Sequence, residues 1–488
     1  MKRLALLLTA LFGVLIALLV IRTMTFTSRQ LRPPSAEKLQ LDKDAIVTRL
    51  SEAIQFKTIS FESGTESNTD PFRDFHAFLA KSFPRVHAQL VREVVNHHSL
   101  LYTWKGKDDR LKPILLMAHI DVVPVDPDSE KLWTHAPFSG QVADGYVWGR
   151  GTMDDKVSVL GILEAVEKLL ADGFQPQCTV YLALGHDEEM GGQQGAAKIA
   201  ALLSQRRVEP EFVLDEGSAI TDGIIPGVAA PVAMIGIGEK GYLTLRLTVT
   251  SPGGHSSLPP SESAIGILSR AIDKVETTRF PRRVNDAVKE FFNFVGPELS
   301  WHKKLLLANL WLTEPWLERE LAKSPLTDSM IRTTKATTIF RAGDKENVLP
   351  ARAQAVINFR LISGDTTEAV IERVRQVIDD ERVKITPLPF SIEPSPISSV
   401  DADGFKLVRR TISQVAPQTI VAPFLTIAST DTRHYAKLTK HIYRFVPIAL
   451  RPEDAERIHG VDERISIEDY ERCIRFYTQL IRNSQSSI

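Results

Sequence analysis

The amino-acid sequence predicts an α/β fold, and three patterns along the chain support this class. Between residues 113 and 215, short continuous apolar runs alternate with segments of helical periodicity, as in a mainly parallel sheet flanked by helices. From Tyr242 onward, apolar and polar residues alternate, which is typical of half-exposed antiparallel strands. The first residues form a separate apolar run. We therefore expect a main α/β domain, an inserted α+β domain and an N-terminal transmembrane helix.

The N-terminal segment, residues 1–35, starts with Lys2 and Arg3 and continues as an uncharged apolar run from Leu4 to Ile21. A helix needs roughly 17–25 residues to cross a bilayer. The two basic residues favour an N-terminus inside the cell, with the body of the protein anchored outside the cytoplasm, in the periplasm or the extracellular space. A cleaved signal peptide with a secreted body is the alternative, although we find no small-x-small cleavage site after the run.

The main domain is expected in two parts, residues 36–242 and 393–488. Its first part should contain helices at 46–54, 72–79, 157–170 and 196–203 and buried strands at 114–118, 179–184 and 212–214. Its second part should contain a helix at 401–415, a strand at 442–448 and a closing helix at 467–481. Two cysteines, Cys178 and Cys473, lie in apolar segments, and we expect buried thiols, with a disulfide as the alternative.

The inserted domain should cover residues 243–392. Strands at 242–250, 337–341, 353–361 and 383–390 and helices at 264–275 and 367–378 follow the strand-helix-strand-strand-helix-strand order of a ferredoxin-like unit. Residues 281–335 are additional to this order and are rich in leucine and tryptophan, among them Trp301, Trp311 and Trp316. They form either a buried helical insertion or one wall of an apolar substrate channel.

Acidic residues and histidines follow the buried strands of the main domain. His119 and Asp121 follow the first strand, Glu188 and Glu189 the second, and Asp215 the third. Asp154 lies between glycines and a helix, and His459 lies in a polar loop before the last helix. Crowded carboxylates are unfavourable unless a cation compensates them, and oxygen and nitrogen ligands without thiolate suit Zn²⁺, with Co²⁺ or Mn²⁺ as alternatives. A net charge of −1 without a basic stripe gives no reason to expect a nucleic-acid partner.

These motifs occur in the order and spacing of the M20 metallopeptidases, which the chain resembles from about residue 45 to 482. The motifs are His119-x-Asp121, Gly149-Arg150-Gly151-x-x-Asp154-Asp155-Lys156, Asp187-Glu188-Glu189-x-Gly191-Gly192 and Gly254-His255-Ser256-Ser257. The resemblance implies two Zn²⁺ ions per subunit, with His119 and Asp215 on one, Glu189 and His459 on the other, and Asp154 between them. It also implies that Asp121 orients His119 and that Glu188 is the general base.

The same resemblance gives roles to the inserted domain, which would act as a lid and as a dimerisation domain. His255 is similar to a histidine that reaches the oxyanion, in its own subunit or in the partner of a homodimer. Asn347 and Arg360 are similar to a pair that binds the substrate carboxylate. From the residues alone, the segment around His255 could be a structural turn and Arg360 could form a plain ion pair at a strand edge.

Further motifs resemble one branch of the family, which includes Gly-X carboxypeptidases and N-fatty-acyl-amino-acid synthase/hydrolases. These motifs are Val213-Leu214-Asp215-Glu216-Gly217, Gly238-Glu239-Lys240-Gly241 and Ser429-Thr430-Asp431-Thr432-Arg433. They imply a zinc hydrolase that cleaves, and in reverse forms, the amide bond of N-fatty-acyl amino acids. A carboxypeptidase acting on short peptides is the alternative. A membrane-tethered binding protein with a dead site would have lost Glu188 or a metal ligand, and all are present.

Overall fold

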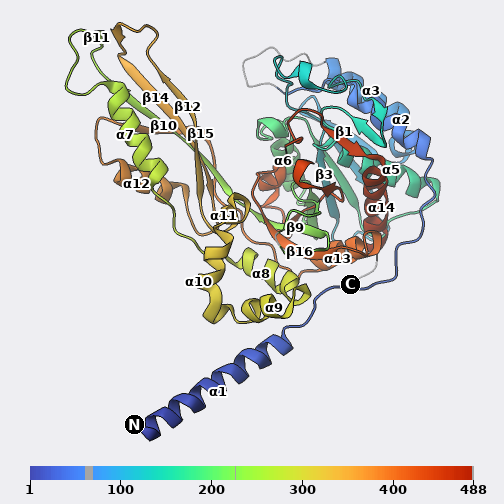
Figure 1. Cartoon of the computed structure of the whole chain (residues 1–488). Coiled ribbons are helices and arrows are strands. Elements are labelled where there is room, and N and C mark those ends of the chain that lie inside the picture. Colours follow the sequence, from blue (N-terminus) through green and yellow to red (C-terminus); the bar gives the residue numbers. More distant parts are fainter. Residues whose placement is uncertain (61–69, 226, 455, 486–488) are drawn as a thin grey trace.

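The computed structural model describes the chain except for residues 61–69, 226, 455 and 486–488 (Figure 1). Part of the polar loop expected at residues 60–70 therefore lies outside the described residues. The main sheet has ten strands, of which nine follow one another in space and the tenth, β16, pairs with β9. In spatial order they are β1 (Val91–Val95), β2 (Ser99–Trp104), β6 (Val180–Gly185), β3 (Ile114–His119), β7 (Phe212–Asp215), β17 (Ile442–Arg444), β9 (Val232–Glu239), β8 (Ile220–Thr221) and β18 (Ala449–Leu450), with β16 at Ile420–Thr426.

The main sheet is mixed. Its four central strands, β6, β3, β7 and β17, are parallel to one another, as the continuous apolar runs predict. The pairs β1–β2, β2–β6, β17–β9 and β8–β9 are antiparallel, whereas β16–β9 and β18–β8 are parallel, so antiparallel pairs flank the parallel centre that was expected. The reason is visible between β1 and β2, where Asn96 and His97 adopt positive φ angles in a tight turn. A turn of this length can join only antiparallel strands.

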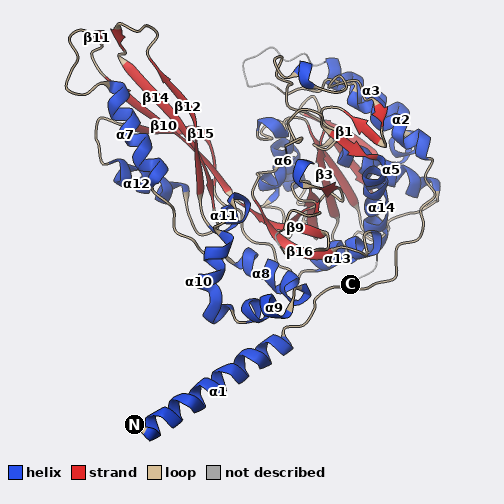
Figure 2. Cartoon of the chain, in the orientation of Figure 1, coloured by secondary structure: helices blue, strands red, loops and turns tan. Residues whose placement is uncertain are grey.

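Helices cover both faces of the main sheet (Figure 2). One core contains apolar side chains of α5 (Lys156–Ala171), α13 (Asp403–Val415) and α14 (Ile467–Asn483), together with Leu116 of β3. On the opposite face α6 (Ala196–Gln205) packs against Leu115 and Met117 of the same strand. The alternation follows from the two-residue period of a strand. Further helices are α2 (Lys43–Ile54), α3 (Asp70–Ser82) and α4 (Pro84–Gln89).

A second sheet lies apart from the first and has the predicted element order (Figure 1). Its strands, in the spatial order β12, β14, β10, β15, are Thr334–Ala342, Arg352–Leu361, Gly241–Thr250 and Lys384–Ile392. Two helices, α7 (Ala264–Thr277) and α12 (Thr367–Ile378), pack on one face, where alternate residues such as Leu243 and Leu245 are buried. At the far end the short strands β11 (Gly254–His255) and β13 (Val348–Leu349) pair with each other.

Residues 281–335, which are additional to the ferredoxin-like order, are mostly helical, as the interpretation as a helical insertion requires. It contains α8 (Asp286–Val295), α9 (Trp301–Ala308), α10 (Leu310–Leu321) and α11 (Pro325–Ile331). Helix α8 buries Val288, Phe291 and Val295 in the core of the main sheet. In contrast, α9 and α10 leave Trp301, Trp311 and Trp316 about half exposed.

The remaining elements include two strands that the sequence analysis did not predict, β9 and β16. A small sheet of β19 (Arg464–Ser466), β5 (Tyr146–Trp148) and β4 (Val142–Ala143) lies beside the main one. Cys178 and Cys473 are free, buried thiols, so the expected alternative of a disulfide is not realised. The N-terminal helix α1 (Lys2–Thr25) projects away from the body and is long and apolar enough to cross a membrane, a property that signal sequences share (Figure 1).

Candidate metal centre

The five expected metal ligands come from five different loops or strand ends. His119 is the last residue of β3 and Asp215 the last residue of β7, two neighbouring parallel strands. Glu189 follows β6 in a short 3₁₀ helix, Glu188–Met190. Asp154 lies just before α5, and His459 lies in the loop before β19 with a positive φ of 61°. The carboxyl ends of the parallel strands thus meet the two outer loops at one edge of the sheet.

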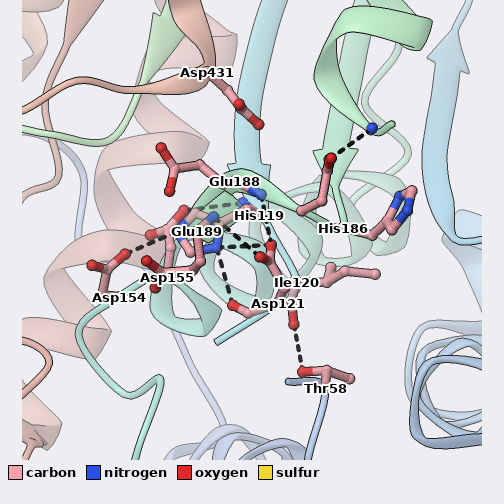
Figure 3. Close-up of polar contacts among 12 residues, drawn as sticks. Thr58, His119, Ile120, Asp121, Asp154, Asp155, His186, Glu188, Glu189 and Asp431 are labelled. Carbon is pink, nitrogen blue, oxygen red and sulfur yellow. Dashed lines mark hydrogen bonds and ion pairs between the residues drawn. The ribbon is translucent and has the colours of Figure 1, made fainter. Parts of the chain in front are cut away.

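Four of these side chains are in direct contact, and Figure 3 labels three of them, His119, Asp154 and Glu189. The Asp154 carboxylate lies between two histidines, with Oδ1 2.8 Å from His119 Nε2 and Oδ2 3.0 Å from His459 Nε2. Glu189 Oε1 lies 3.1 Å from the same nitrogen of His459. Asp154 therefore occupies the central position that the family resemblance implies for a bridging ligand.

The donor atoms of this cluster fit a divalent metal. One ligand atom each of His119, Asp154 and Glu189 lies within 4.8 Å of the others. Ligands on a tetrahedral zinc ion, bound at 2.0–2.2 Å, lie about 3.3 Å from one another. Asp215 is 3% exposed, and its Oδ2 atom has no hydrogen-bond partner among the described residues. Burial raises the pKa of Asp215 to about 6, which is the electrostatic cost that a bound cation would remove.

Hydrogen bonds to carboxylates hold both histidines in the cluster. Burial opposes the charged form of His119, but its contacts with Asp121 and Asp154 outweigh burial and raise its pKa well above the usual value. For His459, the hydrogen bonds with Asp154 and Glu189 raise the pKa to about 10. Metal binding would release these protons, because a histidine binds a metal through its neutral ring.

Asp121 has the position of an orienting residue. It is fully buried, its backbone carbonyl oxygen lies 3.0 Å from His119 Nδ1, and its Oδ1 atom lies 3.3 Å from the same nitrogen. The two carboxylate oxygens also accept hydrogen bonds from the backbone N–H groups of Glu188 and Glu189, each at 3.2 Å. A single side chain therefore positions one expected ligand, His119, and the loop that carries the expected base (Figure 3).

Glu188 lies beside the cluster without being part of its contacts, as a general base requires. Burial first, and then the nearby carboxylates of Asp431, Glu189 and Asp154, raise its pKa well above the usual value. A carboxylate with a raised pKa can both accept and return a proton near neutral pH.

Two acidic residues support the site although the sequence analysis gave them no role. Glu463 is fully buried, pairs with Arg150 at 2.6 Å and accepts a hydrogen bond from Met153 N at 2.9 Å. Arg150 also donates to the carbonyl oxygen of His459, so this ion pair joins the loops of Asp154 and His459. Arg150 belongs to the Gly149-Arg150-Gly151 motif and Glu463 to none of the motifs named above, so only their contacts reveal this role.

Asp431 is the second residue of this kind. It is 3% exposed and lies above Glu188 (Figure 3). Its carboxylate occupies the space beside Gly192, where a Cβ atom would come within 1.8 Å of Oδ1, and Gly192 has a positive φ of 64°. Gly192 is therefore required by the close approach of Asp431.

The expected residues of the second sheet fall into two groups. His255 and Asn347 are exposed neighbours at its far end, on β11 and just before β13, and the structure does not bring them to the metal cluster (Figure 1). Arg360, on β14, lies at the other end with its guanidinium 4.6 Å from the ring of Tyr242. Among the described residues it has no carboxylate partner, so the structure does not support the plain ion pair considered above.

A chain of ring contacts leads from Arg360 toward the metal cluster. The ring of Tyr242 packs on Phe390 with centroids 5.3 Å apart, and Arg433 stacks on the same phenylalanine at 5.4 Å. Phe390 in turn closely approaches Gly191, two residues after Glu189. Arg360 is thus a half-buried guanidinium that faces the side of the second sheet nearest the cluster.

A cavity of about 780 Å³ begins at the metal cluster and extends under the helical insertion. At one end its wall contains Met153, Asp154 and Glu216. The remainder is mostly apolar and is built from α8–α11 and from strands of the main sheet, including Phe291, Phe292, Leu299, Leu306, Leu307, Trp316, Leu317, Leu321, Leu326, Phe424 and Ile448. Helix α8 is therefore buried core, as the first interpretation of the insertion requires, and it also lines an apolar cavity.

Two solved structures share the fold of this chain. An M20 family metallo-carboxypeptidase from Sulfolobus solfataricus superposes with a TM-score of 0.66 at 19% identity, covering 91% of this chain and all of that one. Human carnosine dipeptidase 1 superposes with a TM-score of 0.64 at 15% identity, covering 91% of this chain and 96% of that one. At these identities the comparison establishes the fold.

Sequence comparison extends over most of the chain. A probable carboxypeptidase S-like 2 from Dictyostelium discoideum is 46% identical, over 97% of this chain and 93% of its own length. An N-fatty-acyl-amino acid synthase/hydrolase PM20D1 from Xenopus tropicalis is 43% identical over the same shares, and carboxypeptidase S from Saccharomyces cerevisiae is 31% identical over 90% of this chain and 84% of its own. The model of peptidase family M20/M25/M40 matches residues 115–483. The chain belongs to this family of metallopeptidases and related hydrolases.

Proposed function

We propose that the protein is a two-metal hydrolase that cleaves, and in reverse forms, the amide bond between a fatty acid and an amino acid. The observation that carries this proposal is the apolar cavity that begins at Asp154 and runs between the insertion and the main sheet. Its volume lies in the range of roughly 300–1,000 Å³ that is typical of small-molecule sites. A dipeptide would leave most of this apolar surface without a partner.

The metal-dependent chemistry of the family fits the residues of the cluster. His119 and Asp215 would hold one ion, Glu189 and His459 the other, and Asp154 would contact both. Zn²⁺ suits these donors, with Co²⁺ or Mn²⁺ as alternatives. When bound, two such ions lower the pKa of water and stabilise negative charge on the acyl oxygen.

Glu188 would carry the proton. It takes one from the attacking water, whose oxygen forms a bond with the acyl carbon, and it later gives this proton to the amine nitrogen as the C–N bond breaks. The products are a fatty acid and a free amino acid, and the reverse order of steps forms the amide. The raised pKa of Glu188 supports its use in both directions.

Arg360 would bind the free carboxylate of the amino acid, which explains why the amide must lie next to one. Its guanidinium has no carboxylate partner among the described residues and is stacked on Tyr242, which restricts its orientation. Asn347 and His255 would contribute to carboxylate and oxyanion binding only after the second sheet moves as a lid, or from the partner subunit of a homodimer. Their exposed position at the tip of that sheet supports either route.

A carboxypeptidase that acts on short peptides is the second candidate function. Relatives named carboxypeptidase S, at 31%, and probable carboxypeptidase S-like 2, at 46% identity, support it. The test is to measure kcat/KM of the purified, zinc-loaded protein for long-chain N-acyl amino acids and for dipeptides such as Gly-Leu. We expect the acyl substrates to react faster. Dipeptide turnover that is faster by orders of magnitude would contradict the fatty-acyl assignment and support the carboxypeptidase.

We also propose that α1 is retained as a membrane anchor with the body outside the cytoplasm, rather than removed to release a secreted protein. The contacts of its last turns support retention. Asn309, which is 1% exposed, donates hydrogen bonds to the carbonyl oxygen of Leu19 at 3.2 Å and to Thr23 Oγ1 at 3.4 Å. Arg22 donates to the carbonyl oxygen of Ala308 at 3.3 Å. Removal of α1 would leave the buried amide of Asn309 with fewer partners.

A further inference from the structure

The insertion contacts the N-terminal helix α1 at the end of its apolar run, around residues 19–23. The apolar run Leu4–Ile21 is about 27 Å long at 1.5 Å per residue, close to the roughly 30 Å of a bilayer core. Arg22 then marks the level of the lipid headgroups. Since Asn309 contacts Leu19 and Thr23, the junction between α9 and α10 lies at this level.

The segment that follows α1 fixes this arrangement. Phe26 packs against Gly296, where a Cβ atom would come within 2.7 Å of the phenylalanine ring. Gln30 donates hydrogen bonds to the carbonyl oxygens of Phe294 and Val421, and its side-chain oxygen accepts one from Val421 N. The helix is therefore joined to the insertion and to β16 by specific contacts, rather than by a free tether.

Large apolar side chains are exposed at the same level. Trp301, Trp311 and Leu312 are 52%, 53% and 49% exposed, and none of them lines the cavity. Tryptophan is enriched at membrane–water interfaces because its ring is apolar and its N–H group is polar. Trp311 lies two residues from Asn309, so it belongs to the part of α10 that the contact with α1 brings to the headgroups.

The rim of the cavity includes residues of α10 and α11, together with Ile427 after β16, which also lines the cavity and is 37% exposed. Trp316 and Leu326 line the cavity and are also 43% and 37% exposed, which places them at its rim. Leu306 and Leu307 of α9 line its interior. Helices α9 and α10 thus have two different faces. Their outer residues lie at the level of the headgroups, and their inner residues form part of the cavity wall.

We propose that the outer face of α9 and α10, formed by Trp301, Trp311 and Leu312, rests on the bilayer that holds α1, and that the cavity opens to this bilayer so that acyl chains enter it from the membrane. The occupant of this face is a phospholipid surface. Entry of acyl chains rests on the proposed enzymatic function, whereas contact with the bilayer rests only on the proposed retention of α1 as a membrane anchor.

Docking is tested with the full chain reconstituted in phosphatidylcholine nanodiscs, with and without bromine on the lipid chains near the glycerol. Three of the six tryptophans lie in the insertion, so brominated lipid should quench a large part of the emission. The quenched part should disappear in a variant with W301F, W311F and W316F. The control W133F, a buried position in the main domain, should keep it. Quenching in the triple variant equal to that in the native chain would overturn docking, and so would the absence of quenching in the native chain. Either result would leave a protein as the partner of this face.

Entry from the membrane is tested with the double variant W311E and L312E, which changes only exposed residues outside the cavity. Turnover of a long-chain N-acyl amino acid dissolved in the nanodisc should fall at least fivefold, while turnover of a water-soluble N-acetyl amino acid stays unchanged. Equal turnover of the long-chain substrate in both proteins would overturn entry from the membrane. If the native chain cleaves neither substrate, the proposed function fails, and the quenching result still decides the docking.

Discussion

Asp121 connects three parts of the metal cluster through one carboxylate. It lies beside His119 and accepts the backbone N–H groups of both Glu188 and Glu189. Its substitution by asparagine would keep the size of the side chain but replace one acceptor oxygen by a donor NH₂ group, which cannot accept a backbone N–H.

For Asp121→Asn we expect metal affinity or activity to fall by about 10- to 100-fold, because the negative charge beside the metal-binding histidine is lost although the backbone carbonyl oxygen of residue 121 stays near its Nδ1 atom. Metal affinity is measured by titration with a competing chelator, and activity is measured at saturating zinc. Asp126→Asn, an exposed carboxylate on the following loop, is the matched control. Unchanged affinity and activity in Asp121→Asn would show that Asp121 does not orient His119.

A substitution of Glu188 separates metal binding from proton transfer more clearly than a substitution of Asp121 does. Glu188→Gln should retain the metal, because its side chain makes none of the contacts of the cluster, and should lose at least about 100-fold in kcat through loss of the general base. The metal content is checked by elemental analysis of the same preparation. Substantial turnover by a metal-loaded variant would exclude Glu188 as the base.

The strands of the main sheet show which sequence patterns allow a strand to be predicted. The central strands were predictable because they are buried on both faces and read as continuous apolar runs. Strands β9 and β16 were missed because β9 contains two glycines, Gly236 and Gly238, and β16 contains Pro423, which all weaken the signal of a strand. The proximity of the expected ligands His119, Glu189 and Asp215 follows from their positions at or just after strand ends, whereas the contacts of Glu463 and Asp431 join distant loops and have no local signal.

Helix α3 carries a buried histidine that links its packing to pH. His76 is 9% exposed and its Nε2 lies 2.8 Å from the carbonyl oxygen of His98. Burial lowers its pKa to about 4. Between pH 6.5 and 4, the unfolded chain therefore binds a proton at this residue that the folded chain does not, and the free energy of unfolding falls as the pH falls.

We expect acidification from pH 6.5 to pH 5 to cost the wild type up to about 2 kcal/mol more than His76→Gln, at about 1.4 kcal/mol per pH unit. Unfolding by urea at the two pH values measures this difference. In His97→Gln, a substitution at an exposed position nearby, the pH dependence should match the wild type. The same pH dependence in His76→Gln and in the wild type would show that His76 does not contribute.

The arrangement of the whole molecule brings together segments that lie far apart in the sequence. The cavity joins Asp154 and Glu216 of the main domain to helices α8–α11 of the insertion, and α1 contacts that insertion from the other side. The sequence raised an apolar channel only as one of two interpretations, because a helix that lines a cavity and a helix in a core have the same composition. The proposed movement of the second sheet would likewise depend on hinge geometry that no local pattern encodes.

The central claim is that the cavity beside the metal cluster holds an acyl chain, and a chain-length comparison in a cavity variant tests it most directly. Leu306→Trp would fill the cavity, and Leu305→Trp, on the same helix but outside the lining, is the matched control. We expect kcat/KM for a long-chain N-acyl amino acid, divided by that for its N-acetyl analogue, to fall at least about tenfold in Leu306→Trp and to stay near the wild-type value in Leu305→Trp. An unchanged ratio in Leu306→Trp would contradict the claim.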